Sequence, residues 1–401
     1  MMEQVLKSLM PAYGGYSLAR DEKVIFIRGA IPGEVVEVRI EEKKKDYSIA
    51  SVINVIEPSE YRVEPQCRVF GICGGCQLQF ATHEKQLDMK NEILLDSFVR
   101  IGGIDTVLDP VLSDGQWNYR YRAQFKVSRT HDIGFFKGSS REVVAFDECP
   151  LLNRQINELL HKMKEKDVVN NLAEIHVAMG DTPVVLLKGR DYDTATFEKF
   201  VDIGISGIAY GDTLSYGGAY TGFDLNGLRY TISPWTFFQS HWDLNRKVID
   251  FIVNRLAPLE GKRVLDLYAG AGNFSIPLAA RAAEVVAVEE SVHAADDGMR
   301  NLELNDIKNC RFVRSSAEKF KVHKKFDVII LDPPRLGLTS EVLRKILENP
   351  ADEIVYISCN PSTLARDLKK LREIYDLRSV RQIDFFPQTY HIESISFLQR
   401  R

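Results

Sequence analysis

The stretch RVLDLYAGAGNF, residues 263–274, is an apolar run that ends in a turn with two glycines. Three more apolar runs follow, separated by segments of helical length: EVVAVE at 284–289, DVIIL at 327–331 and EIVYIS at 353–358. Alternating strands and helices are typical of a parallel, doubly wound sheet that is covered on both faces. The sequence therefore predicts an α/β domain with such a sheet over residues 236–401.

Polar residues follow these apolar runs at the places where a ligand would bind. Ligands of doubly wound sheets lie at the carboxyl ends of the strands. Gly270 ends the first run, and glycines let the backbone approach a ligand closely. Glu289 comes about 20 residues later, where a carboxylate can accept hydrogen bonds from a ribose diol. We expect an adenosine-containing ligand, and Ser275 in place of a third glycine disfavours a dinucleotide.

The third run leads into the loop Asp332-Pro333-Pro334-Arg335. The two prolines stiffen the chain where a substrate edge would be held beside the ligand. Enzymes that methylate amino groups have a comparable loop with an aromatic residue after the prolines. Arg335 stands at that position here, which disfavours methylation of an amino group.

Cys359 follows the fourth run and is the candidate nucleophile. A lone cysteine after an apolar strand is usually a packing residue, but Cys359 belongs to the same strand-end crevice as Gly270 and Asp332. Carbon 5 of uracil is too weakly nucleophilic to accept a methyl group directly, so a thiolate must first add to carbon 6. A base must then remove the C5 proton. Glu393 is the candidate base, and His391 is its rival.

Four other cysteines indicate a metal site. Cys67, Cys73 and Cys76 lie close together, and Cys149 lies far downstream, directly before a proline. Four thiolates suit either an iron–sulfur cluster or tetrahedral zinc. Structural zinc usually uses two close CxxC pairs, so three clustered cysteines and a distant fourth favour a [4Fe–4S] cluster. We expect the sixth cysteine, Cys310, to be a packing residue.

The chain of 401 residues is 45% hydrophobic, which is enough for several separate cores. Residues 1–58 contain short apolar strands between glycine and proline turns and predict a small β-barrel. Apolar residues have helical spacing over 83–101, and strand-like alternation returns over 116–230. We find neither a signal-peptide pattern nor a membrane-spanning run, and therefore expect a cytoplasmic protein with no membrane partner.

The charge of the chain argues mildly against a nucleic-acid partner. The formal net charge is −4 and the pI is near 6.1, whereas phosphate binding usually requires a basic surface. Positive charge for RNA must therefore be local. Arg120 and Arg122 alternate with Tyr119 and Tyr121, which combines cations with stacking surfaces, although a solvated face would explain this cluster equally well.

Together these residues resemble the RNA 5-methyluridine (uracil-C5) methyltransferase family, in the branch with an N-terminal TRAM barrel and a [4Fe–4S] cluster. The resemblance covers nearly the whole chain. It implies a Rossmann-like, S-adenosylmethionine-dependent methyltransferase domain, with Cys359 as the nucleophile and Glu393 as the base. The implied S-adenosylmethionine contacts are Gln239, Tyr268, Asn273, Glu289 and Asp332. The implied cluster ligands are Cys67, Cys73, Cys76 and Cys149.

The resemblance also implies a division into three domains. The TRAM β-barrel would cover 1–58, and a central β-rich domain with the cluster would cover 59–82 and 106–235. The catalytic domain would combine 83–105 with 236–401.

Several alternatives remain open. We expect 23S rRNA as the substrate, with the T-loop of tRNA as the alternative. A noncatalytic iron–sulfur RNA-binding protein would not need Cys359 and Glu393 together, and an amino-directed methyltransferase would work without a cysteine. We expect a monomer.

Overall fold

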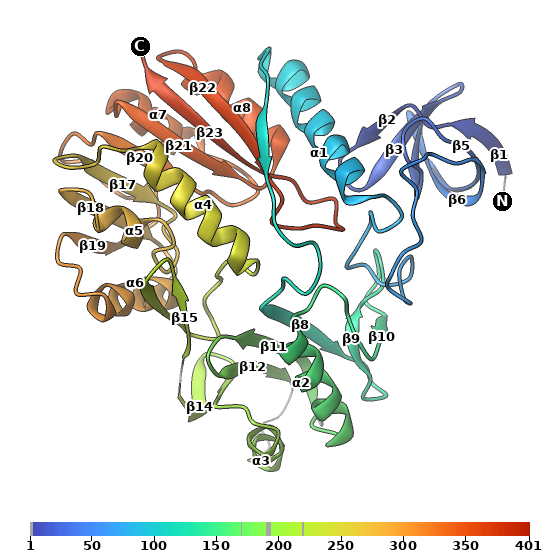
Figure 1. The fold of residues 1–401 in the computed structure, drawn as a ribbon, viewed down its shortest axis with the longest axis horizontal. Coiled ribbons are helices and arrows are strands. Elements are labelled where there is room, and N and C mark those ends of the chain that lie inside the picture. Colours follow the sequence, from blue (N-terminus) through green and yellow to red (C-terminus); the bar gives the residue numbers. More distant parts are fainter. Residues whose placement is uncertain (1–2, 170, 190–193, 219) are drawn as a thin grey trace.

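The computed structural model describes residues 3–169, 171–189, 194–218 and 220–401 (Figure 1). An N-terminal β-unit lies at one side of the molecule, a central β-rich unit lies below it in the view, and the largest sheet lies opposite (Figure 1). None of the helices in the described ranges is long and apolar enough to cross a membrane.

The N-terminal unit is a six-stranded sheet. Its strands are β1 (Glu3–Lys7), β2 (Met10–Ala12), β3 (Tyr16–Arg20), β4 (Val24–Arg28), β5 (Val35–Lys43) and β6 (Tyr47–Glu57). Their order in the sheet is β1-β5-β6-β4-β3-β2. Buried and more exposed residues alternate along β3, β4 and the first half of β5, which turns one face towards a small core. Ile27, Val36, Val38 and Ala50 are fully buried in that core.

The central unit combines a seven-stranded sheet with two helices. Its elements are β8 (Arg122–Val127), β9 (Ile133–Phe136), β10 (Val143–Ala145), α2 (Arg154–Glu165), β11 (Leu172–Met179), β12 (Pro183–Gly189), α3 (Thr194–Asp202), β13 (Gly207–Tyr210) and β14 (Thr213–Gly217). The strand order is β10-β9-β8-β11-β12-β13-β14. Leu160 of α2 and Phe200 of α3 pack with Ile175 and Val185 of the sheet in one core.

The largest sheet has eight strands and contains the four predicted ones. They are β7 (Asp109–Leu112), β17 (Arg263–Leu267), β18 (Glu284–Glu289), β19 (Cys310–Arg314), β20 (Val328–Leu331), β21 (Glu353–Ser358), β22 (Tyr375–Ile383) and β23 (Glu393–Arg400). Their order is β19-β18-β17-β20-β21-β23-β22-β7. The five strands from β19 to β21 are parallel, and β23 is antiparallel to both of its neighbours. The carboxyl ends of the parallel strands therefore meet at one edge.

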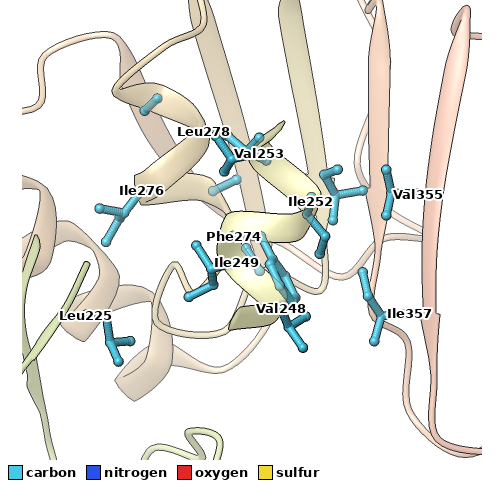
Figure 2. Close-up of a cluster of buried hydrophobic side chains, with 14 of the residues drawn as sticks. Leu225, Val248, Ile249, Ile252, Val253, Phe274, Ile276, Leu278, Val355 and Ile357 are labelled. Atoms are coloured by element: carbon cyan, nitrogen blue, oxygen red, sulfur yellow. The ribbon is translucent and has the colours of Figure 1, made fainter. Parts of the chain in front are cut away.

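Helices cover both faces of this sheet. They are α1 (His83–Ser97), the π-helical turn η1 (Phe98–Gly102), α4 (Trp242–Arg255), α5 (Ser275–Ala279), α6 (Val292–Leu304), α7 (Ser340–Glu348) and α8 (Pro361–Leu371). Successive residues of a strand point to opposite faces, so Val264 and Leu265 enter two different cores. Figure 2 shows one core, where Val248 and Ile252 of α4 face Ile357 and Val355 of β21. The expected doubly wound α/β architecture is present.

Two short segments pack with this sheet although the sequence analysis placed them in the central domain. β7 pairs with β22, just beyond the predicted segment 83–105. β15 (Thr221–Leu225) and β16 (Leu228–Ile232) form a separate hairpin. Phe223 of this hairpin lies 4.0 Å, ring centroid to centroid, from Trp242 of α4. The apolar side chains of these segments pack in the core between the large sheet and its helices. No local sequence pattern indicated these contacts.

Candidate active site

A cavity of about 820 Å³ opens at the carboxyl ends of β17, β18, β20 and β21. All seven residues that the sequence analysis assigned to the ligand or the chemistry line it. They are Gln239, Tyr268, Asn273, Glu289, Asp332, Cys359 and Glu393. The rival base His391 lines the same cavity. The fold thus brings together side chains that are spread over more than 150 residues of sequence.

The glycine-rich turn after β17 forms one wall of this cavity. Gly270 has φ +57° and Gly272 has φ +90°, a region of backbone conformation that side chains disfavour. A Cβ on Gly272 would lie 2.7 Å from Cδ1 of Ile276, so this position also requires glycine for space. A Cβ on Gly270 would meet nothing within 4 Å, so the space beside that residue is open to a ligand.

Hydrogen bonds hold the polar groups around the turn. The Glu289 carboxylate accepts bonds from the backbone N–H of Gly270 at 2.9 Å and of Ser291 at 2.7 Å. The amides of Asn273 and Asn245 bond to each other at 2.8 and 3.2 Å. By contrast, Oε1 of Gln239 is buried without a hydrogen-bond partner among the described residues. A buried acceptor of this kind is usually satisfied by a ligand or water.

Two carboxyl groups that line the cavity, Asp332 and Glu393, and the fully buried Asp266 of β17 are held partly protonated near neutral pH. Burial raises the pKa of Asp266 and of Asp332 to about 7. Burial and the nearby Asp332 raise the pKa of Glu393 to about 8, against the opposing effects of Arg335 and Lys90. Each negative charge here is costly because it is desolvated, and for Asp266 and Glu393 also because acidic side chains lie nearby.

Cys359 lies between β21 and α8. Burial, followed by the charges of Glu393 and Asp332, raises the pKa of its thiol to about 12, and Arg335 opposes this rise. Arg335 is tied to the same place, because its carbonyl accepts a bond of 3.1 Å from the Asn360 side chain and one of 3.3 Å from Thr363 Oγ1. The Asp-Pro-Pro-Arg loop is therefore hydrogen-bonded to the residues that follow Cys359.

Burial and the neighbouring Arg335 together set the protonation state of His391. Its Nη2 lies 3.1 Å from Nδ1 of His391. Burial and then the charge of Arg335 lower the pKa of His391 to about 4. A neutral ring can accept a hydrogen bond from the guanidinium through Nδ1, which leaves His391 a weak base.

A buried ion pair holds the loop that leads to Glu393. Lys90 of α1 donates to Oδ1 of Asp384 at 2.6 Å and to the carbonyl of Phe386 at 3.1 Å. The Lys90 and Asp384 side chains are 2% and 0% exposed, and His83 adds a contact of 2.7 Å to the other carboxylate oxygen. Although burial raises it, the charges of Lys90 and His83 hold the pKa of Asp384 below its ordinary value.

Gln388 fastens the same loop to two other segments. Its backbone has φ +69°, and the residue is almost fully buried. Its side-chain oxygen and backbone N–H both bond to the Gln86 amide at 2.9 Å. Its carbonyl accepts bonds of 3.0 Å from the backbone N–H groups of Gln77 and Leu78. The sequence analysis missed Lys90 and Gln388, because their partners lie about 300 residues away and no local pattern marks them.

The four clustered cysteines also come together. Cys67, Cys73, Cys76 and Cys149 line one small cavity beside Arg120. Within the described ranges, however, no three Cys, His, Asp or Glu side chains are placed to hold a metal ion. The structure shows a shared location for the four thiols and does not show a metal site. Cys310 is buried in the core, as expected for a packing residue.

Comparisons with known proteins identify the family of this chain. The family model described as tRNA (Uracil-5-)-methyltransferase matches residues 223–401, and the TRAM domain model matches 11–53. A protein of Alkalilimnicola ehrlichii, named 23S rRNA (uracil(1939)-C(5))-methyltransferase RlmD, is 33% identical over 95% of this chain and 92% of its own length. The chain belongs to the RNA (uracil-C5) methyltransferase family. The predicted activity and TRAM domain of the methyltransferase are thereby confirmed.

Two further matches extend this result. An RNA methyltransferase of Aquifex aeolicus, otherwise uncharacterized, is 35% identical and covers 96% of both chains. The crystal structure of Pyrococcus abyssi tRNA (uracil-54, C5)-methyltransferase, in complex with S-adenosyl-L-homocysteine, matches with a TM-score of 0.79. It covers 99% of the methyltransferase described here at 24% identity, which shows that the two proteins share a fold.

Lys90→Met should destabilise the methyltransferase strongly. It leaves the buried Asp384 carboxylate without its main counterion, which typically costs about 3–5 kcal/mol. Lys308→Met is the matched control, because Lys308 pairs with Asp306 at 2.7 Å on a fully exposed surface. Chemical denaturation of both variants measures the difference, and equal losses of stability would contradict the role of the buried pair.

Glu393→Gln should become more stable relative to the wild type as pH rises. The Glu393 pKa is about 8 in the folded protein and near 4.5 in the unfolded chain. The folded state therefore holds the proton more tightly, and the wild type loses stability from about pH 4.5 to 8. Melting temperatures at pH 5 and pH 8 should show a gain of at least about 2 °C for the variant at the higher pH. The exposed Glu22→Gln should show no such trend.

Proposed function

We propose that this methyltransferase acts on a uridine of 23S rRNA, with Cys359 as its nucleophile and Glu393 as its base. The observation that supports these roles is the single cavity that holds both side chains beside the glycine-rich turn. Full-length relatives at about a third identity carry 23S rRNA in their names, which favours this RNA. The T-loop of tRNA is the alternative, because the matching crystal structure is of a tRNA enzyme.

The cavity fits S-adenosylmethionine as the methyl donor. The proposed contacts are Gln239, Tyr268, Asn273, Glu289 and Asp332. The Glu289 carboxylate is held in place by two backbone N–H groups and can still accept from ribose hydroxyls, since each carboxylate oxygen has more than one lone pair. The unpartnered Oε1 of Gln239 can accept from the ligand. S-adenosylmethionine supplies a methyl group on a positively charged sulfur, and a cation suits a cavity where acidic groups raise each other's pKa.

The protein's own groups account for the steps on the uracil ring. The Cys359 thiolate forms a bond from Sγ to C6, and the electron pair of the C5–C6 double bond moves to give an enolate. C5 then accepts the methyl group that bound S-adenosylmethionine would supply, and the bond between that methyl group and sulfur would break to leave S-adenosylhomocysteine. Glu393 removes the C5 proton as a carboxylate, the double bond reforms, and the bond between Sγ and C6 breaks. The positive charge of Arg335 lowers the cost of forming the thiolate.

Glu393 suits the role of base better than His391. A base works best when its pKa is near the operating pH, and the pKa of Glu393 is about 8. The pKa of His391 is about 4, and Arg335 contacts its Nδ1. His391 with Arg335 thus forms a fixed polar wall of the cavity.

Trapping with 5-fluorouridine tests the proposed chemistry. Fluorine at C5 cannot leave as a proton does, so the wild type should form a stable covalent complex with 23S rRNA transcribed with 5-fluorouridine, in the presence of S-adenosylmethionine. Cys359→Ser should lose this complex, because a hydroxyl is a far weaker nucleophile than a thiolate. Glu393→Gln should form a complex even with ordinary uridine, since the proton at C5 is not removed.

Denaturing gels and sequencing of the trapped RNA measure the complex and its position. A complex that survives in Cys359→Ser would exclude Cys359 as the nucleophile. No complex with 23S rRNA and a clear complex with a tRNA transcript would establish the tRNA alternative. No complex with either RNA, in protein that binds S-adenosylmethionine, would contradict the proposed roles of Cys359 and Glu393.

We also propose that Cys67, Cys73, Cys76 and Cys149 hold a [4Fe–4S] cluster. Their shared cavity and the adjacent Arg120 support this, because the complex of a cubane cluster with four thiolates is anionic. The side chains would need small rearrangements to ligate it, since the described residues are not placed to bind a metal as they stand. The proposed role is structural, as Gln77 and Leu78 next to Cys76 bond to the loop that leads to Glu393.

Metal analysis of anaerobically purified protein tests the cluster. Iron and acid-labile sulfide should each approach about four per chain. Cys149→Ser should lower both, whereas Cys310→Ser, which changes a buried cysteine outside this cavity, should leave both unchanged. Stoichiometric zinc without sulfide would contradict the proposal.

The domain division remains part of this proposal: a TRAM barrel over 1–58, a central domain, and a catalytic domain that includes α1. We keep the catalytic domain's early segment but extend it to Leu112, because β7 belongs to the large sheet. The monomeric state and the cytoplasmic location stay predictions.

A further inference from the structure

The turn between β2 and β3 of the barrel touches the loop that leads to Glu393. A Cβ on Gly15 would lie 2.7 Å from Cβ of Gln77 and 3.5 Å from Cβ of Tyr390, so the backbone of the turn passes close to both residues. Gln77 in turn accepts a bond from the Tyr390 backbone N–H at 3.4 Å. The barrel is thus packed against the active-site loop and does not merely precede it in sequence.

Tyr13 of this turn contacts the active-site loop through its aromatic ring. Its ring meets that of Tyr390 edge to face, with centroids 5.5 Å apart. The Tyr390 ring lies 4.3 Å from that of His391, which lines the cavity. Tyr13 remains 37% exposed, and its hydroxyl forms no hydrogen bond with the described residues. A partly exposed aromatic ring with a free hydroxyl is suited to binding a nucleotide.

The charges of active-site groups act on the hydroxyl of Tyr13. Burial raises the pKa of its hydroxyl. Arg335 lowers this pKa, and Tyr390, Cys359 and Glu393 raise it further. Such effects fall off with distance, so they agree with the ring contacts that link Tyr13 to the cavity through Tyr390 and His391. Tyr13 is therefore part of the surroundings of the active site, although it comes from another domain and lies almost 350 residues before Cys359.

The charge of the barrel makes an aromatic contact more plausible than a purely ionic one. The first 60 residues carry ten Asp/Glu and eight Lys/Arg. A domain with this balance gains little from phosphate neutralisation. Stacking on an aromatic side chain needs no net charge, because every base has a π-face.

We propose that Tyr13 forms the barrel-side wall of the uridine site and packs its ring against the target nucleotide. This inference rests on the proposed function, since it assumes that a uridine enters the cavity to reach Cys359. The barrel then contributes directly to positioning the reacting base. A barrel that only tethered RNA would change affinity, whereas Tyr13 should change the rate at saturating RNA.

Single-turnover formation of the 5-fluorouridine complex tests this distinction. Wild-type and variant full-length proteins are mixed with S-adenosylmethionine and increasing 23S rRNA transcribed with 5-fluorouridine, and the saturating rate and the half-saturating RNA concentration are measured. Tyr13→Ala should lower the saturating rate about tenfold, the size expected for the loss of one stacking contact. Tyr13→Phe keeps the ring and should stay within about threefold of the wild type.

Tyr47→Ala is the matched control. Tyr47 is also a barrel tyrosine, is also 37% exposed, and also meets another ring edge to face at 5.5 Å, but that ring is Phe26 of the barrel. Its saturating rate should equal that of the wild type. Tyr13→Leu keeps apolar packing against Tyr390 but has no flat ring. If the ring stacks on the nucleotide, this variant should be as slow as Tyr13→Ala. If Tyr13 only packs against the active-site loop, Tyr13→Leu should be as fast as the wild type.

Calorimetric binding of S-adenosylmethionine and melting temperatures establish that each variant is folded. An unchanged saturating rate for Tyr13→Ala would overturn the inference, whether or not the half-saturating concentration rises. So would a Tyr13→Leu variant as fast as the wild type. If the wild type itself forms no complex, the proposed function fails, and this outcome is distinct from a failure of the Tyr13 variants alone.

Discussion

The buried pair of Lys90 and Asp384 ties the earliest helix of the large sheet to the loop that ends at Glu393. A desolvated ammonium and carboxylate must stay together, because separating them leaves an uncompensated charge in the interior. Gln388 adds bonds from this loop to Gln86 and to the cysteine segment. The place of Glu393 opposite Cys359 therefore depends on contacts between parts of the chain almost 300 residues apart.

The electrostatics of the cavity follow from the acidic side chains that are buried in and beside it. Asp332, Glu393 and the nearby Asp266 are all desolvated, so each resists ionisation, and Cys359 beside them resists it as well. The positive charge of Arg335 opposes these effects at Cys359 and Glu393, and its backbone carbonyl is held by Asn360 and Thr363. In the proposed reaction, the positive charge of the methyl donor would stabilise the ionised forms of these acidic groups. Binding of the donor would therefore favour ionisation of the site.

The main features of the site were predictable because its residues directly follow apolar strands. Parallel strands bring their carboxyl ends to one edge, so Gly270, Glu289, Asp332 and Cys359 had to lie near each other once the sheet formed. The pairing of β7 and of the hairpin β15–β16 was not predictable in the same way. These strands are short, and their partners are chosen by apolar surface elsewhere in the chain.

The sequence by itself determined the doubly wound sheet, the residues at its strand ends and the cysteine pattern, because each depends on the order and spacing of neighbouring residues. Only the tertiary structure decided that Lys90 is buried against Asp384, that Arg335 contacts His391, and that Tyr13 of the barrel reaches the active-site loop. These contacts join segments that have no pattern in common. Their energies arise from burial and from charges at short range, and both exist only after the chain has folded.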